Sequence, residues 1–191
     1  MSETKKDCVY NNDIADEVTA IAQSYRKKHP DSEESFQMQA LIYKQLGMLD
    51  KQKEILQQAT NQSFAAPRCA IMLADMEFRE HNYDQSLQNF QKAIAQSDNM
   101  KTAVHDGYLY VMTALCKMAS AKQKNTELSK EDVLNIYGDL NAALSYEEGL
   151  NETHKEIVAK KATYLIGKYD IAIPAKDKKL REFMKELKTQ D

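Results

Sequence analysis

Apolar side chains recur at intervals of three and four residues along most of the chain, which is the spacing of one face of an α-helix. Short breaks, such as those at Pro30 and Gly47, separate these runs at places where helices are expected to stop. The pattern predicts about nine helices, with bounds near 13–29, 32–47, 49–62, 67–80, 81–99, 101–121, 129–146, 152–169 and 176–191. Residues 1–12 lack this periodicity, and we expect them to form a flexible N-terminal tail.

Composition strengthens the all-α interpretation. The chain of 191 residues contains 5 Gly, 3 Pro and no Trp, which leaves few residues suited to hairpin turns, while good helix formers dominate. Hydrophobic residues make up 42% and charged residues 29%, as is usual for a folded globular protein. We therefore expect an all-α fold.

The predicted helices follow one another in pairs, and two consecutive pairs are related by a shift of 34 residues. The shift superposes the two turn residues Gly47 and His81. It also superposes similar residues inside the helices: Ala40 and Ala74, Leu56 and Phe90, Ala59 and Ala93. A helix–turn–helix period of this length is the tetratricopeptide spacing. The alternative is a generic helical bundle in which the shift arises by chance.

Residues 31–100 resemble the tetratricopeptide repeat (TPR) family. The positions that carry the resemblance are Phe36, Ala40, Tyr43, Gly47, Leu56 and Ala59 in one unit, and Leu73, Ala74, Tyr83, Ser86, Phe90 and Ala93 in the next. The chain departs from the family pattern at Gln39, Gln52 and Glu77, where the family prefers apolar or small residues. The resemblance implies a TPR-like right-handed superhelix of antiparallel helix pairs.

The remaining residues can be assigned to repeats in the same register. Residues 13–30 match the second helix of a half repeat, and the full repeats are 31–66 and 67–100. Residues 101–146 form a degenerate repeat with Gly107 at the small position and a polar insertion near 123–129. Ser129 and Asp132 have the spacing of a capping box that starts the next helix. Residues 147–191 are expected to supply C-terminal capping helices, because a stack of repeats needs an end with one polar face.

The net charge and the cysteine content limit the classes of partner and the cellular compartment that we expect for the chain. The net charge of −3, with basic residues scattered along the chain, offers no basic face for a nucleic acid. No stretch reaches the roughly 18 apolar residues that a membrane span needs, so direct membrane insertion is not expected. The three cysteines are far apart and odd in number, which favours reduced thiols in a cytoplasmic protein.

No motif in the sequence predicts an enzyme, a cofactor or a metal site. The phosphate loop, the nucleophile elbow and the zinc motif His-Glu-x-x-His are all missing. Glu77 and His81 are spaced so that one helix could present both to a metal, but an ion pair at a helix end is the favoured interpretation. Cys69 and Cys116 lie inside apolar stripes, where a buried thiol behaves as a small hydrophobic group.

The TPR resemblance implies that the first helix of each pair lines a concave groove that binds another protein. Carried over position by position, this predicted groove contains Gln37, Met38, Leu41, Arg68, Ile71, Met72, Asp75, Phe78, Arg79, Lys101, His105, Tyr108 and Met112. Some family members clamp the acidic tail of a chaperone with Lys and Asn. Here Gln37, Leu41 and Met72 stand at the first three of those positions, which disfavours such a partner.

The mixed apolar character of the predicted groove favours protein–protein interaction as the function. Flexible methionines adapt to varied apolar ligands, so we expect an amphipathic helix or an extended peptide of a partner protein. The chain would then act as an adaptor or an assembly subunit. Four alternatives stay open: packing of these residues against the chain's own terminal helices, a secretion-type chaperone that holds unfolded segments, an enzyme with an unrecognised site, and a homo-oligomer.

Overall fold

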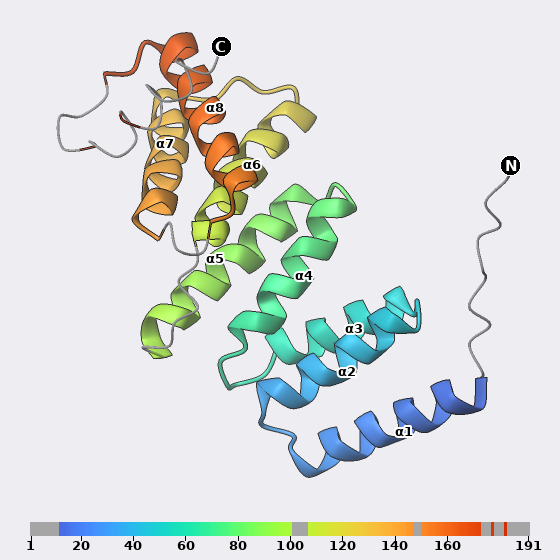
Figure 1. The fold of residues 1–191 in the computed structure, drawn as a ribbon. Coiled ribbons are helices and arrows are strands. Elements are labelled where there is room, and N and C mark those ends of the chain that lie inside the picture. The colour runs from blue at the N-terminus through green and yellow to red at the C-terminus, as the bar shows by residue number, and fades with distance from the viewer. Residues whose placement is uncertain (1–11, 101–106, 147–149, 173–176, 178–181, 183–191) are drawn as a thin grey trace, which may run out of the picture. The chain divides into compact units, whose positions relative to one another are not determined.

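The computed structural model describes residues 12–100, 107–146, 150–172, 177 and 182, and this part of the chain is all-α, with no strand (Figure 1). Its eight helices are α1 (Asn12–Lys28), α2 (Glu33–Gln45), α3 (Leu49–Thr60), α4 (Pro67–Arg79), α5 (Tyr83–Met100), α6 (Gly107–Gln123), α7 (Lys130–Ser145) and α8 (Glu152–Tyr169). The predicted all-α class is therefore confirmed. The predicted tail and nearly all of the predicted helix 176–191 lie outside the described residues.

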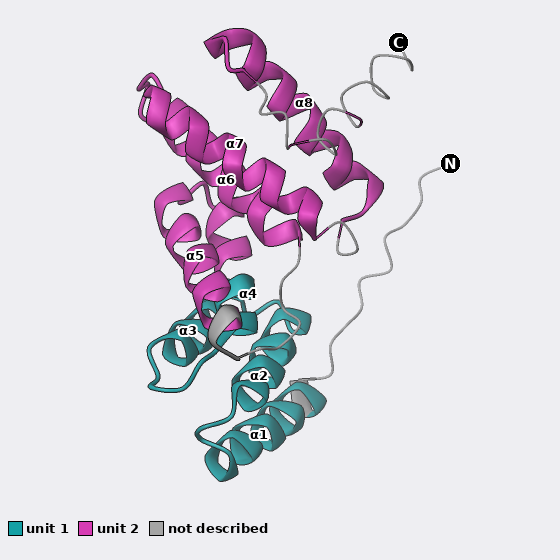
Figure 2. Cartoon of the chain, turned by 90° about the vertical axis from the view of Figure 1, so that its left-hand side faces the viewer, with its two compact units in different colours: residues 1–73 teal, residues 74–191 magenta. Residues whose placement is uncertain are grey.

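The chain divides into two compact units, residues 1–73 and 74–191 (Figure 2). The division falls inside α4, whereas the sequence predicts a repeat boundary after residue 66. Hydrogen bonds link the first turn of α4 and its middle to different helices. The backbone N–H of Cys69 donates to Glu33 Oε1 in α2 at 2.9 Å, while Ser86 Oγ in α5 donates to the Ala74 carbonyl at 2.9 Å.

The 34-residue period is visible in the backbone of two turns. Gly47, after α2, has φ 70°, and His81, after α4, has φ 63°. In both turns the next residue donates its N–H to the carbonyl five residues earlier, at 2.8 Å. This is the Schellman arrangement, in which a left-handed residue closes a helix.

A third turn of the same kind ends α6, but at a longer interval. Asn125 has φ 56°, and the next residue, Thr126, donates to the Ala121 carbonyl at 3.0 Å. Because α5 and α6 have 18 and 17 residues, against 12 and 13 in α3 and α4, this turn comes later than the period predicts. The connection that follows, residues 124–129, is also longer than the turns 46–48 and 80–82.

The core of the first unit contains the positions on which the resemblance depends. The side chains of Phe36, Ala40, Tyr43, Leu56 and Ala59 are all buried. Their spacing places them on the faces that α2 and α3 turn toward each other. The sequence pattern therefore identifies the interior of this helix pair correctly.

The core of the second unit forms where α6, α7 and α8 meet. The six apolar residues that recur with helical spacing along α7 are all buried: Val133, Ile136, Tyr137, Leu140, Ala143 and Leu144. The predicted capping box is present, with the Asp132 N–H donating to Ser129 Oγ at 3.1 Å and the Ser129 N–H donating to Asp132 Oδ2 at 3.0 Å. Gly107 lies so close to α7 that a Cβ there would sit 2.6 Å from the Ala143 carbonyl oxygen.

Candidate partner-binding groove

Helix α1 packs on α2 through a small part of its apolar stripe. Ala22 is fully buried, whereas Ile14 and Ile21 are 59% and 61% exposed and Val18 and Tyr25 are 37% and 39% exposed. Large apolar side chains favour burial because their transfer out of water releases free energy. These four side chains leave accessible apolar surface along α1.

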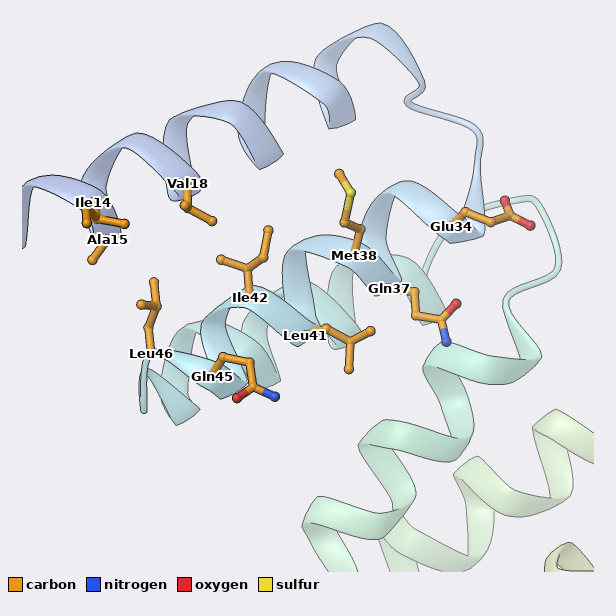
Figure 3. Close-up of a pocket in the computed structure, with 10 residues that line it drawn as sticks. All are labelled: Ile14, Ala15, Val18, Glu34, Gln37, Met38, Leu41, Ile42, Gln45 and Leu46. Atoms are coloured by element: carbon orange, nitrogen blue, oxygen red, sulfur yellow. The ribbon is translucent and has the colours of Figure 1, made fainter. Parts of the chain in front are cut away.

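An open apolar groove of about 770 Å³ lies between α1 and α2, and we call it the α1–α2 groove (Figure 3). Its lining residues are Ile14, Ala15 and Val18 from α1, and Glu34, Gln37, Met38, Leu41, Ile42, Gln45 and Leu46 from α2 and its C-terminal end. Figure 3 shows Val18 pointing from α1 toward Ile42 on α2. The two helices thus form the walls of one pocket within the first unit.

The side chains on the α2 wall form two rows, each with a spacing of four residues. Met38, Ile42 and Leu46 make the row directed at α1, and Gln37, Leu41 and Gln45 make the row beside it (Figure 3). Residues four apart lie above one another on a helix, so the rows run along the helix axis. Helix α2 is therefore apolar on two sides, one facing the core and one facing the groove.

Glu34 is the one ionisable residue among those that line the groove. Its carboxylate accepts a hydrogen bond from Ser32 Oγ at 2.7 Å, and this bond holds the pKa of Glu34 below its ordinary value. The group is therefore charged at neutral pH. The groove can bury apolar side chains along its length and pair with one cation at its Glu34 end, and it contains no nucleophile with an adjacent base.

Three predicted groove residues, Gln37, Met38 and Leu41, line the α1–α2 groove. The predicted residues on the first half of α4 do not line it. Arg68 is exposed there, and Ile71 and Met72 are half-buried. These six residues all belong to the first unit.

The other seven predicted groove residues belong to the second unit, five of them are described, and two of those five bind each other. The Tyr108 hydroxyl donates to Asp75 Oδ1 at 2.5 Å. Burial raises the pKa of Tyr108, and the hydrogen bond to Asp75 raises it further. The phenol therefore stays protonated and serves as an internal link between α4 and α6.

The other predicted residues of the second unit differ in accessibility. Phe78 is half-buried with its ring centroid 5.3 Å from that of Tyr83, and Arg79 is exposed. As a correction to the predicted groove, Met112 is buried at 8% exposure, because α6 is enclosed by its neighbours on more than one side. Lys101 and His105 lie outside the described residues.

Sequence reasoning missed the α1 wall and half of the α2 wall. Ile14 and Val18 share an apolar stripe in the sequence, but the periodicity of a helix does not reveal whether its apolar face is covered. Ile42 and Leu46 were missed because the positions carried over from the resemblance include only Met38 of their row. A usable signal was the second apolar face of α2, at residues 38, 42 and 46.

The pair Glu77 and His81 forms neither the metal site nor the ion pair considered from the sequence. Glu77 is buried, and its Oε2 accepts a hydrogen bond from Asn89 Nδ2 at 2.8 Å. The His81 ring is hydrogen-bonded through Nδ1 to the Tyr83 hydroxyl at 2.8 Å. The two side chains diverge because α4 ends at Arg79, before His81.

The two described cysteines are buried and free. Burial raises the pKa of Cys69 to about 12 and that of Cys116 to about 11. Neither thiol forms a reactive thiolate at neutral pH, so both act as small core residues. The interpretation of these cysteines as buried apolar groups is confirmed.

Comparison of the chain with protein-family models and with curated proteins found no match. None of the helices in the described ranges is long and apolar enough to cross a membrane. Among the same residues, no group of three or more His, Cys, Asp or Glu is placed to hold a metal ion.

Proposed function

We propose that the chain is a non-enzymatic protein–protein interaction module, an adaptor or assembly subunit, and that its α1–α2 groove receives the apolar face of a helix from a partner protein. The observation that carries this proposal is the accessible apolar surface on both walls. Ile14 and Val18 on α1 are 59% and 37% exposed, and Leu41 on α2 is 42% exposed. Contiguous exposed apolar surface of this kind marks interaction sites.

The shape of the groove favours a helix as the occupant. Its walls are two helices whose side chains repeat every four residues, and a third helix packs by placing its own ridge of side chains between such rows. The partner would present apolar residues at positions i, i+3 or i+4, and i+7. A Lys or Arg at one end of that helix would pair with the Glu34 carboxylate.

Two further features support the proposal. The matching turns at Gly47 and His81 are what a TPR-like protein would have, and proteins of that class bind other proteins. The buried free thiols of Cys69 and Cys116 suit a reducing compartment such as the cytoplasm. The proposal accordingly places the interaction inside the cell.

Crosslinking from two matched positions tests the proposal. Leu41 in the groove and Leu134 on α7 are both exposed helical leucines, at 42% and 47%. The photocrosslinking amino acid p-benzoylphenylalanine would replace each in turn, in cells of the native source. We expect position 41, and not position 134, to crosslink one partner at a segment with the apolar helical spacing described above.

Aspartate variants at the same two positions allow a second measurement, the affinity for the partner peptide. L41D should weaken binding of the crosslinked segment, supplied as a synthetic peptide, by at least about tenfold, because a carboxylate in an apolar contact must lose its hydration. L134D should leave the affinity unchanged. The proposal is wrong if position 41 yields no protein crosslink or if both variants bind the peptide equally. Crosslinks to many unfolded chains would instead favour a chaperone, and crosslinks to the chain itself a homo-oligomer.

A further inference from the structure

The apolar stripe of α1 extends beyond the part that lines the α1–α2 groove. The stripe consists of Ile14, Val18, Ile21 and Tyr25, and all four side chains are exposed. Ile14 and Val18 line the groove, whereas Ile21 and Tyr25 do not. Ala22, which is fully buried, lies on another side of the helix. Most of the length of α1 therefore carries apolar surface that the described part of the first unit leaves accessible.

The four residues of the stripe are spaced as in a helix that pairs with a second helix. The intervals between them are four, three and four residues, which is the a/d spacing of a two-stranded coiled coil. In such a pair, each apolar side chain inserts between side chains of the facing helix. The 17 residues of α1 span about 25 Å, so the stripe fits a partner helix of similar length.

The intervals of the stripe read the same in both directions along the helix. If a second α1 lies antiparallel to the first, with a two-fold axis between Val18 and Ile21, these two residues face each other across the axis. Ile14 of each copy then faces Tyr25 of the other. Every apolar residue of the stripe meets another apolar residue, and this is the self-complementary patch that a two-fold interface requires. The helix α1 can therefore supply both halves of one interface.

The charges beside the stripe favour the antiparallel arrangement. Glu17 lies four residues before Ile21 and Lys28 lies seven residues after it, so both border the stripe, and both are exposed. Arg26 is bound within the first unit instead, because its Nη1 donates to Gln58 Oε1 at 3.1 Å. Parallel helices would place each bordering charge next to the same charge of the other copy. Antiparallel helices bring the end with Glu17 toward the end with Lys28, which is attractive.

We propose that the chain forms a two-fold symmetric dimer in which the α1 stripes of two copies pack antiparallel. Ile14 and Val18 then lie at the edge that this interface shares with the α1–α2 groove. The dimer does not rest on the proposed partner, because Ile21 lies outside the groove and Leu41 lies outside the stripe. One dimer carries two grooves, so it would bind a partner with two suitable helices more tightly than one copy could.

Sedimentation velocity of the full chain and of aspartate variants tests whether the dimer forms. We expect the chain to pass from monomer to dimer as its concentration rises through the micromolar range. I21D should weaken the dimer at least about tenfold, because the carboxylates would lose their hydration in an apolar contact. L134D replaces an exposed leucine on α7 and should dimerise like the unmodified chain. A monomer throughout this range would leave the stripe to another segment or protein and overturn the proposal, as would equal dimerisation of I21D and L134D.

Two variants separate the dimer from the partner groove. L41D should lose affinity for the partner peptide and keep the dimer, whereas I21D should lose the dimer and still bind the peptide. Circular dichroism checks that both variants are folded. Hydrogen exchange in α1 should be fast in the dilute monomer and slow down as the dimer forms, and I21D should not show this slowing. Loss of the dimer in L41D to the same extent as in I21D would contradict an interface made by the stripe.

Disulfide formation reports the orientation of the two helices. In a C8S background, a mixture of I14C and Y25C should oxidise mainly to the mixed disulfide, because these positions face each other in an antiparallel pair. Ala20 is exposed on a different side of α1, so A20C mixed with Y25C should give little disulfide. Disulfides that join I14C mainly to itself would show a parallel pair and contradict the proposal, as would equal yields from the two mixtures.

Discussion

Gly107 shows at the scale of one residue how closely two helices of the second unit approach. A Cβ at this position would lie 2.6 Å from the Ala143 carbonyl oxygen and 2.8 Å from that of Tyr146, and backbone atoms cannot move aside cheaply. Gly138, in the middle of α7, has no atom within 4 Å of its virtual Cβ. Gly107 and Gly138 are therefore suited to a paired comparison, because a methyl group would clash at the first and meet open space at the second.

We predict opposite effects of alanine at these two glycines. G107A should destabilise the chain by about 1–3 kcal/mol through overpacking. G138A should stabilise it by up to about 1 kcal/mol, because alanine loses less conformational entropy in a helix. Urea unfolding followed by circular dichroism measures both changes. Similar values for the two variants would contradict the close approach at Gly107.

At the scale of elements, an ion pair joins α6 to α7. Lys117 Nζ lies 2.7 Å from Asp139 Oδ2, and the two side chains are 23% and 19% exposed. Burial raises the pKa of Asp139, and the hydrogen bond and charge of Lys117 lower it by less. The folded-state pKa is therefore above the unfolded one, so the ionised carboxylate costs stability at neutral pH, and this cost disappears as the pH falls below the pKa.

We predict that the effect of K117M depends on pH. Removal of the lysine leaves a buried carboxylate without its cation, so K117M should cost about 1–3 kcal/mol at pH 7. The cost should shrink toward pH 4, where the carboxyl group becomes protonated. Adding D139N to K117M should recover much of the loss at pH 7. Unfolding curves at the two pH values test this, and a penalty that is the same at both would refute the buried-charge explanation.

The whole molecule contains two compact units, each with buried residues of its own. Leu56 in α3 and Leu140 in α7 are both fully buried. L56A and L140A should each cost about 2–5 kcal/mol through the cavity that they create. Because packing in helical arrays is dominated by neighbouring elements, each variant should lower hydrogen-exchange protection chiefly in its own unit.

Hydrogen exchange with mass spectrometry measures this distribution. In the unmodified chain, α1 should exchange faster than α2, since Ala22 is the buried residue of its stripe and four larger apolar side chains of α1 are exposed. Uniform loss of protection across both units in L56A and in L140A would show that the chain unfolds as one cooperative body.

Particular elements show how far sequence reasoning reaches. The start of α4 at Pro67 and the capping box of α7 at Ser129 are as predicted, because proline and capping side chains act through bonds to residues a few positions away. The interior of the α2–α3 pair is also as predicted. In contrast, Met112 was predicted to face a partner and is buried, and Ile42 and Leu46 were missed as groove residues.

The amino-acid sequence alone determines the helical class, the period of the first two turns and the inner face of α7. These features follow from spacing and from local hydrogen bonds, which neighbours in sequence supply. The α1–α2 groove was decided by the tertiary structure. It depends on which apolar groups stay uncovered once helices distant in sequence have packed, and periodicity within one helix carries no information about that.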